Sequence, residues 1–137
     1  MGNEMYSDKV SVNINTSTLS QIDLLVDNGY YSNRSDFINQ AIREVLGKHR
    51  STLDRIVQQN LEKSGGEDHW FLGVMGFTPR EVEEMYAEGE CFHLRGYGVL
   101  HIATGCDEEK LKAVVKSVSI RGKVIAPASV KAHYGLK

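Results

Sequence analysis

The stretch that decides the fold is KVSVNIN, Lys9–Asn15. Apolar and polar side chains alternate along it with a period of two, which is typical of a strand with one buried face. The apolar side chains are those of Val10, Val12 and Ile14, and the polar ones between them are those of Lys9, Ser11, Asn13 and Asn15. We expect the apolar set to face a core and the polar set to face outward.

Two helices are predicted directly after this strand. Polar residues 15–18 offer N-caps for the first helix, and Gly29 ends it because glycine tolerates the left-handed backbone found just past a helix end. The second helix opens at Asn33, with Asp36 three residues later as a pair that resembles a capping box. Its side chains at helical spacing form a wide apolar stripe of Phe37, Ile38, Ala41, Ile42, Val45 and Leu46.

The strand has no partner strand within residues 1–63. An unpaired strand leaves backbone donors and acceptors open, and even an isolated hairpin is barely stable. The same strand from a second copy would complete a two-stranded antiparallel ribbon on a twofold axis. Such a ribbon fits the major groove of DNA, where Lys can donate to guanine, Asn can pair with adenine and Ser can serve either base. The sequence therefore predicts a homodimer that reads double-stranded DNA with Lys9, Ser11 and Asn13.

The segment GYYSNRSDFINQAIR, Gly29–Arg43, together with the strand and the capped first helix, resembles the ribbon-helix-helix superfamily, particularly its CopG-like branch. The resemblance covers residues 8–48. It implies that outward strand side chains read bases, and that the backbone amides of Asn33, Arg34 and Ser35 hold a DNA phosphate. The second role agrees with the preference of helix N-termini for anions. Family strands often carry Arg at outward positions, whereas the only cation here is Lys9.

The Ser64-Gly65-Gly66 stretch marks a linker. We therefore divide the chain into a DNA-binding domain with a helical extension at 1–63, a linker at 64–68, and a regulatory or oligomerisation domain at 69–137. No internal repeat is recognised. The second domain is predicted to contain a strand at 69–77, a helix starting at Thr78-Pro79-Arg80-Glu81, two strands within 91–103 joined by a turn at Gly96-Tyr97-Gly98, a helix from Asp107, a strand at 119–126 and a short helix after Pro127. This is a βαββαβ, ferredoxin-like order in an α+β chain.

A ribbon-helix-helix module followed by such a domain resembles the architecture of nickel-responsive regulators. In that family an ACT-like second domain assembles a tetramer and binds metal through three His and one Cys. The ligand pattern does not carry over, because Val99 stands where the first His belongs and Cys106 follows His101 one position too early. Minor candidates for metal ligands are Cys91, His93, His101 and Cys106, and a structural or solvated role is favoured for all four. No cofactor is required, and a metal or small-molecule effector is left open.

Composition bounds the remaining alternatives. The net charge of -2 lacks the basic excess of most nucleic-acid binders, which predicts modest non-specific affinity. The sequence has only two cysteines, no apolar run long enough to span a membrane and no signal-peptide pattern. We therefore expect a cytoplasmic protein. No nucleophile–base pair or phosphate loop indicates an enzyme. We expect a transcriptional regulator that acts as a repressor, as a homodimer or a higher oligomer such as a tetramer. The alternatives are an antitoxin of a toxin–antitoxin pair and a regulator that responds to a metal or a small molecule.

Overall fold

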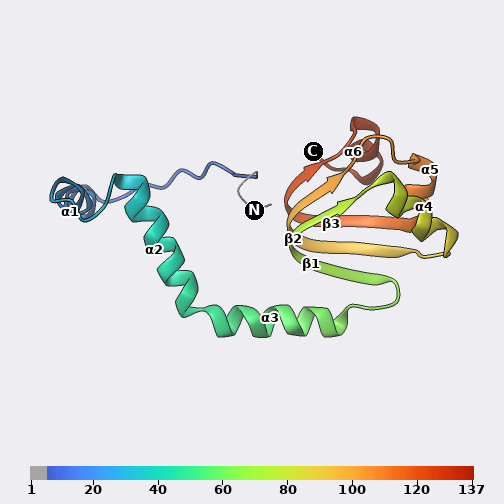
Figure 1. Cartoon of the computed structure of the whole chain (residues 1–137), viewed down its shortest axis with the longest axis horizontal. Helices are drawn as coiled ribbons and strands as arrows, with labels where there is room; N and C mark the ends of the chain where they lie inside the picture. The colour runs from blue at the N-terminus through green and yellow to red at the C-terminus, as the bar shows by residue number, and fades with distance from the viewer. Residues whose placement is uncertain (1–5) are drawn as a thin grey trace. The chain divides into compact units, whose positions relative to one another are not determined.

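The computed structural model describes residues 6–137, which form an α+β chain of two compact units (Figure 1). One unit is Asp8–Ile56, and the other consists mainly of Val57–Lys137. The division falls inside a helix, α3, which spans Arg50–Lys63. No helix among the described residues has the length and apolar character needed to cross a membrane.

The first unit contains α1, Thr16–Asp27, and α2, Arg34–Lys48. Residues 8–15, where a strand is predicted, run outside any helix or strand. A β-strand is defined by its hydrogen bonds to a second strand. In a single copy of the protein, this segment has no second strand to pair with. The strand prediction therefore concerns the dimer.

Both predicted helix starts of the first unit are confirmed. The side chain of Asn15 accepts a hydrogen bond from the Ser17 amide at 2.9 Å, and that of Asn33 accepts one from the Asp36 amide at 2.8 Å. Each bond satisfies an amide that the helix itself leaves unpaired. The turn after α1 uses Gly29 at a φ of 82°, as the sequence predicts.

The second unit contains three strands, each followed by a helix. They are β1 (Asp68–Phe77), α4 (Pro79–Ala87), β2 (Phe92–Ile102), α5 (Glu108–Val114), β3 (Val115–Ile125) and α6 (Ala128–Tyr134). The strands form one sheet in the order β1-β2-β3, and both pairs are parallel. The predicted start of α4 is confirmed, because Thr78 and Glu81 form a reciprocal capping box.

The predicted βαββαβ, ferredoxin-like order is wrong for this unit, whose order is βαβαβα. Gly96-Tyr97-Gly98 lies inside the continuous strand β2 and is not a turn between two strands. The last strand also starts at Val115, four residues earlier than predicted, because α5 ends at Val114. A run rich in β-branched side chains fits a pleated strand better than a helix.

A row of glycines crosses the sheet. Gly73, Gly98 and Gly122 are register partners on the three strands, with φ values of 118°, 130° and 146°. A Cβ on Gly98 would lie 1.9 Å from the carbonyl oxygen of Gly73, and one on Gly122 would lie equally close to that of Gly98. Glycine suits all three positions because of the positive φ, and at Gly98 and Gly122 the close approach of the neighbouring strand requires it. The three strands curl together, as Figure 1 shows. Each strand-helix unit carries its own member of the row, so the prediction that the chain has no internal repeat is wrong.

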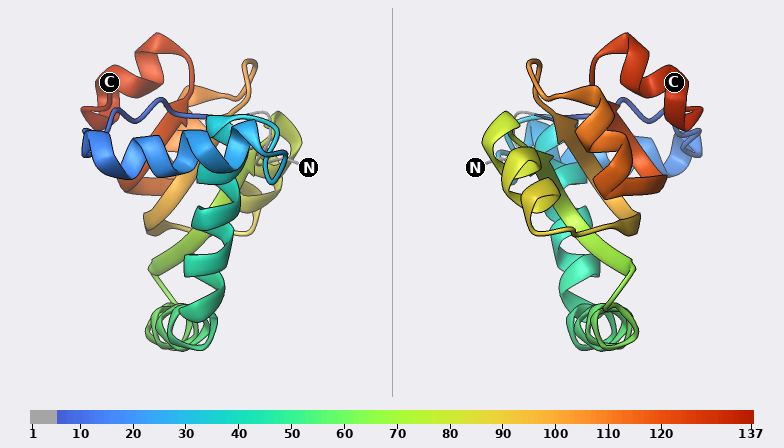
Figure 2. Two further views of the ribbon diagram at one scale, coloured as in Figure 1. Left: turned by 90° about the vertical axis from the view of Figure 1, so that its left-hand side faces the viewer. Right: turned by 90° about the vertical axis from the view of Figure 1, so that its right-hand side faces the viewer.

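The core lies inside this curl, and the three helices close its open side (Figure 2). Strand residues on both sides of the glycine row contribute to it, among them Phe71, Leu94, Leu100 and Ile102. The helices add Val82, Leu111, Val114 and Val130, all at most 2 % exposed. Burial of each such side chain stabilises the unit by about 1.5–3 kcal/mol. The second unit thus has a hydrophobic core of its own.

Candidate nucleic-acid interface

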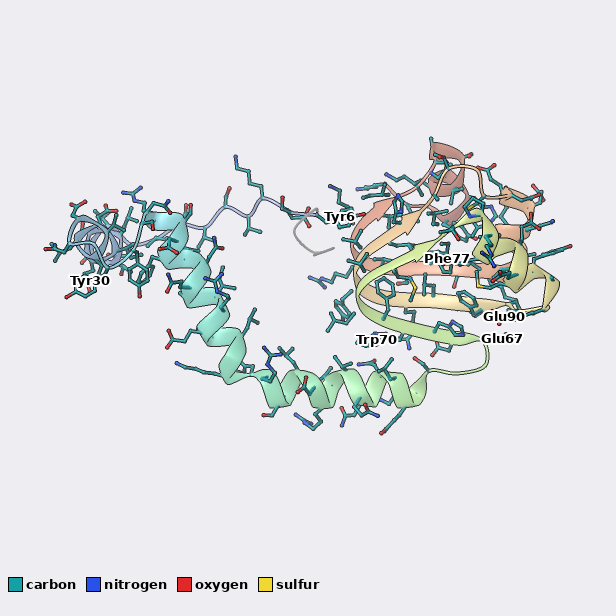
Figure 3. All side chains as sticks on the ribbon, in the orientation of Figure 1. Tyr6, Tyr30, Glu67, Trp70, Phe77 and Glu90 are labelled. Carbon is teal, nitrogen blue, oxygen red and sulfur yellow. The ribbon has the colours of Figure 1, made fainter. Side chains whose placement is uncertain are left out.

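The predicted ribbon segment is solvated along both of its faces. The apolar side chains of Val10 and Val12 are 79 % and 72 % exposed, and Ile14 is also exposed. The three predicted base-reading residues, Lys9, Ser11 and Asn13, are exposed as well. Side chains project from this segment without being covered by others of the same unit (Figure 3). Nothing within residues 8–56 of one copy buries its apolar face.

The helices that follow leave an apolar surface open. Ile22 of α1 is the one buried hydrophobic residue within Asp8–Ile56, and α2 has no buried residue. The stripe predicted along α2 is present but partly exposed, with Ile38, Ile42, Val45 and Leu46 between 38 % and 53 % accessible. A contiguous exposed apolar stripe of this kind is typical of a protein interaction surface.

The start of α2 brings together the three residues predicted to hold phosphate. The backbone amides of Asn33, Arg34 and Ser35 make no hydrogen bond to any other described residue. They sit at the positive end of a 15-residue helix, where unpaired amides favour an anion. The geometry is compatible with a phosphate contact at this helix start.

The side chain of Arg34 is engaged elsewhere. Its guanidinium forms two hydrogen bonds to the Asp23 carboxylate, Nε to Oδ1 at 2.8 Å and a terminal nitrogen to Oδ2 at 2.9 Å. The Arg34 hydrogen bonds lower the pKa of Asp23, and the reverse interaction raises the pKa of Arg34. This pair ties the start of α2 to α1 and so fixes the position of the amides. Asp23 was not predicted from the sequence, because it lies eleven residues from its partner and carries no local signal.

Asp36 fixes the turn that precedes α2. Its carboxylate accepts hydrogen bonds from the Ser32 amide at 3.0 Å and from the Gln40 side chain at 3.0 Å. The Ser32 amide is the largest cause of a lowered Asp36 pKa. The predicted role in helix initiation is therefore modified: Asp36 bonds the residue before the N-cap.

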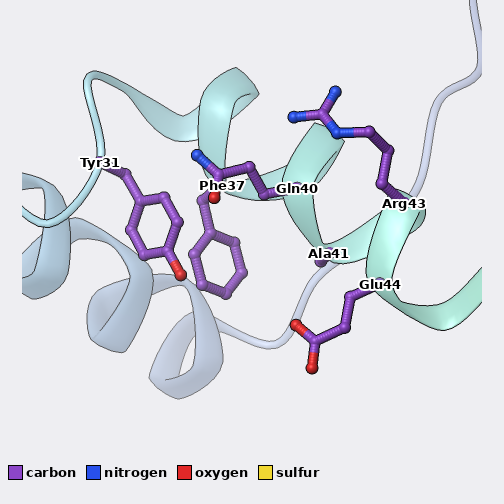
Figure 4. A pocket seen from close by; sticks show the side chains of 6 residues that line it. All are labelled: Tyr31, Phe37, Gln40, Ala41, Arg43 and Glu44. Atoms are coloured by element: carbon purple, nitrogen blue, oxygen red, sulfur yellow. The ribbon is translucent and has the colours of Figure 1, made fainter. Parts of the chain in front are cut away.

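A hollow of about 330 Å³ opens beside α2 (Figure 4). Tyr31 and Phe37 meet edge to face within it, with ring centroids 4.9 Å apart. The rest of it is lined by the side chains of Gln40, Ala41, Arg43 and Glu44. No role for this hollow was predicted from the sequence.

Charge on the first unit is balanced. Residues 8–56 carry six basic side chains, those of Lys9, Arg34, Arg43, Lys48, Arg50 and Arg55. They carry six acidic ones, those of Asp8, Asp23, Asp27, Asp36, Glu44 and Asp54. Without an overall positive field on this unit, any affinity for DNA must come from local contacts.

The four minor metal candidates do not converge. Cys91 contacts Glu67 (Sγ to Oε1, 3.7 Å), and His93 Nδ1 lies 2.6 Å from Ser117 Oγ. Cys106 donates to the Phe77 carbonyl, and burial raises the pKa of its thiol. His101 lies at the far end of β2 in a separate hollow with Thr104 and Ile125. Within the described part of the chain, no three His, Cys, Asp or Glu side chains could share a metal ion.

An exposed alternating segment, two capped helices and an uncovered apolar stripe together describe a DNA-binding ribbon-helix-helix module. Over residues 5–131 the chain matches the model of the Ribbon-Helix-Helix transcriptional regulator family. The protein belongs to this family of transcriptional regulators. No curated protein and no solved structure matches it.

Proposed function

We propose that the protein is a sequence-specific DNA-binding repressor that works as a homodimer, with the paired Lys9–Asn15 segments of two copies in the major groove. The observation that carries this proposal is the scarcity of buried apolar surface in Asp8–Ile56, where Ile22 alone is buried while Val10 is 79 % exposed. A second copy supplies the missing cover.

Pairing of the two segments would stabilise the dimer in two ways. It would satisfy the open backbone groups of residues 9–15 and bring Val10, Val12 and Ile14 of both copies under the α2 stripes. Each side chain buried in this way would stabilise the dimer by about 1.5–3 kcal/mol. Because the dimer is twofold symmetric, each contribution occurs once in each copy.

Residue roles follow from this placement. Lys9, Ser11 and Asn13 lie on the strand face opposite the apolar side chains and would contact base edges. The amides of Asn33, Arg34 and Ser35 would hold a phosphate and fix the register of the ribbon on the duplex.

A DNA-binding measurement tests the proposal. In Asn13→Ala we expect specific binding to a selected operator to weaken by about 1–3 kcal/mol, since Asn can bond adenine through two groups. Asn39→Ala is the matched control, because Asn39 is an exposed Asn on α2 outside the predicted contacts. Titration of labelled operator and of random DNA at one salt concentration gives both affinities. Equal loss on the two DNAs would reduce Asn13 to a non-specific contact.

The antitoxin alternative is less well supported. A segment that folds on a toxin would lack its own core, whereas the unit containing Val57–Lys137 buries Leu94, Leu100 and Leu111 to 1 % exposure or less. We assign this unit the task of joining DNA-bound dimers.

A further inference from the structure

The two edges of the sheet differ in charge. The β3 edge carries Lys116, Arg121 and Lys123. The β1 edge carries no Asp, Glu, Lys or Arg from His69 to Phe77. Charged side chains, lysines above all, protect a sheet edge against pairing with another strand, and β1 lacks that protection.

The backbone of β1 is open along this edge. Asp68 exchanges hydrogen bonds with Gly65 on the side away from β2, while the Phe77 carbonyl accepts from Ala103 on the β2 side. Because directions alternate along a strand, Trp70, Leu72, Val74 and Gly76 point their N–H and C=O groups outward. None of these groups is paired with another described residue. Leu72 and Val74 also expose their side chains, at 55 % and 45 %.

We infer that β1 pairs with β1 of a second copy, antiparallel about a twofold axis at Gly73, to join the two sheets into one. The inference rests on the proposed assembly role of the second unit and names its surface. The curl at the glycine row selects the register of this β1–β1 pair. Both copies of β1 bend at Gly73, and the two bends coincide only if the twofold axis passes through that residue.

In this register, the open backbone hydrogen-bonding groups along the β1 edge all find partners. Leu72 of each copy faces Val74 of the other, and Trp70 faces Gly76, so that all outward residues form hydrogen-bonded pairs. Leu72 and Val74 would then bury part of their exposed surface against each other. Pairing of β1 with β3 of another copy would be heterologous and would build an open chain, whereas β1 with β1 closes.

The test combines variants in the full chain. Val12→Asp removes the ribbon interface, so that any remaining dimer must form through the second unit. We expect Val12→Asp to sediment as a dimer and Val12→Asp/Val74→Lys as a monomer, because a lysine at an exposed edge position blocks pairing without disturbing the core. Val12→Asp/Ser119→Lys is the matched control, with the lysine on exposed Ser119 of β3, and should remain dimeric. A monomeric Val12→Asp, or a dimeric Val12→Asp/Val74→Lys, would overturn the inference.

Hydrogen exchange on the unaltered protein gives an independent readout. The amides of Leu72, Val74 and Gly76 should exchange slowly in the native assembly and rapidly in Val74→Lys, where the edge is open to water. Rapid exchange at these amides in the unaltered protein also overturns the inference. Failure of the proposed function would give a different result. Val74→Lys would still exchange these amides rapidly, and Val12→Asp/Val74→Lys would still be a monomer, yet Val74→Lys would lack affinity for an operator with one binding site.

Discussion

A methyl group at Gly98 would collide with the backbone of the neighbouring strand, since its position lies 1.9 Å from the Gly73 carbonyl oxygen. Gly98→Ala also places a side chain at a φ of 130°, which costs about 1–3 kcal/mol by itself. Overpacking adds about 1–3 kcal/mol. We therefore expect Gly98→Ala to destabilise or unfold the second unit, as measured by thermal denaturation followed through the near-ultraviolet signal of Trp70.

Gly89→Ala separates the two effects. Gly89 also has a positive φ, of 73°, but nothing lies within 4 Å of the position that an added methyl group would take. The substitution should lower stability by only about 1–2 kcal/mol, the cost of a left-handed backbone with a Cβ. If both variants lost equal stability, the close approach at the glycine row would not be what restricts Gly98.

Residue-scale prediction from sequence succeeds where the partners are neighbours in the chain. The caps at Asn33 and Thr78 were predicted because each bonds an amide three residues ahead. The pair of Asp23 with Arg34 was missed, because two exposed charges eleven residues apart meet only after two helices pack. The DNA contacts of Lys9, Ser11 and Asn13 stay predictions, since they depend on a second copy and on DNA.

At the scale of the element, the start of α2 should depend on pH. The Ser32 amide lowers the pKa of Asp36 in the folded protein, below the usual value of about 3.9. The ionised carboxylate therefore contributes stability above that usual pKa, and the contribution is lost as the pH falls through the lowered one. Thermal denaturation between about pH 2 and pH 6 should show wild type losing its advantage over Asp36→Asn at the acid end.

Asp54→Asn is the control for this measurement. Asp54 is an exposed residue of α3, outside the turn that Asp36 fixes, so Asp54→Asn should keep the Asp36 hydrogen bonds and lose their contribution at the acid end as wild type does. A constant gap between wild type and Asp36→Asn across the pH range would contradict the role of the Asp36 carboxylate.

The strand β2 shows why element prediction failed in the second unit. Gly96-Tyr97-Gly98 was interpreted as a turn because glycine pairs usually mark one. Yet inward positions continue unbroken through it, from Phe92 and Leu94 before the glycines to Leu100 and Ile102 after them. This period of two fits one continuous strand, so the prediction of two strands gave the glycines too much weight. What the sequence could not supply is the row of partners across the sheet, which explains the glycines as a bend.

At the scale of the whole molecule, the two proposed interfaces would have different roles in DNA binding. The Lys9–Asn15 ribbon would select a DNA site, and the β1 edge would connect one ribbon dimer to another. The balanced charge of residues 8–56 gives a single dimer little general attraction to DNA. Connection of two dimers would offset this by making the second binding event intramolecular.

This division predicts how affinity depends on the number of sites. On DNA with two operator sites, the unaltered protein should bind about 10²–10⁴-fold more tightly than on DNA with one, the range expected of linked binding modules. Val74→Lys should bind one site normally, because residues 8–56 are untouched, and should lose most of the two-site gain. Ser119→Lys should retain the gain. Titrations of both DNAs at one salt concentration measure the ratio. An undiminished ratio in Val74→Lys would mean that the β1 edge does not connect dimers, and a ratio near one in the unaltered protein would mean that the edge closes within a single ribbon dimer.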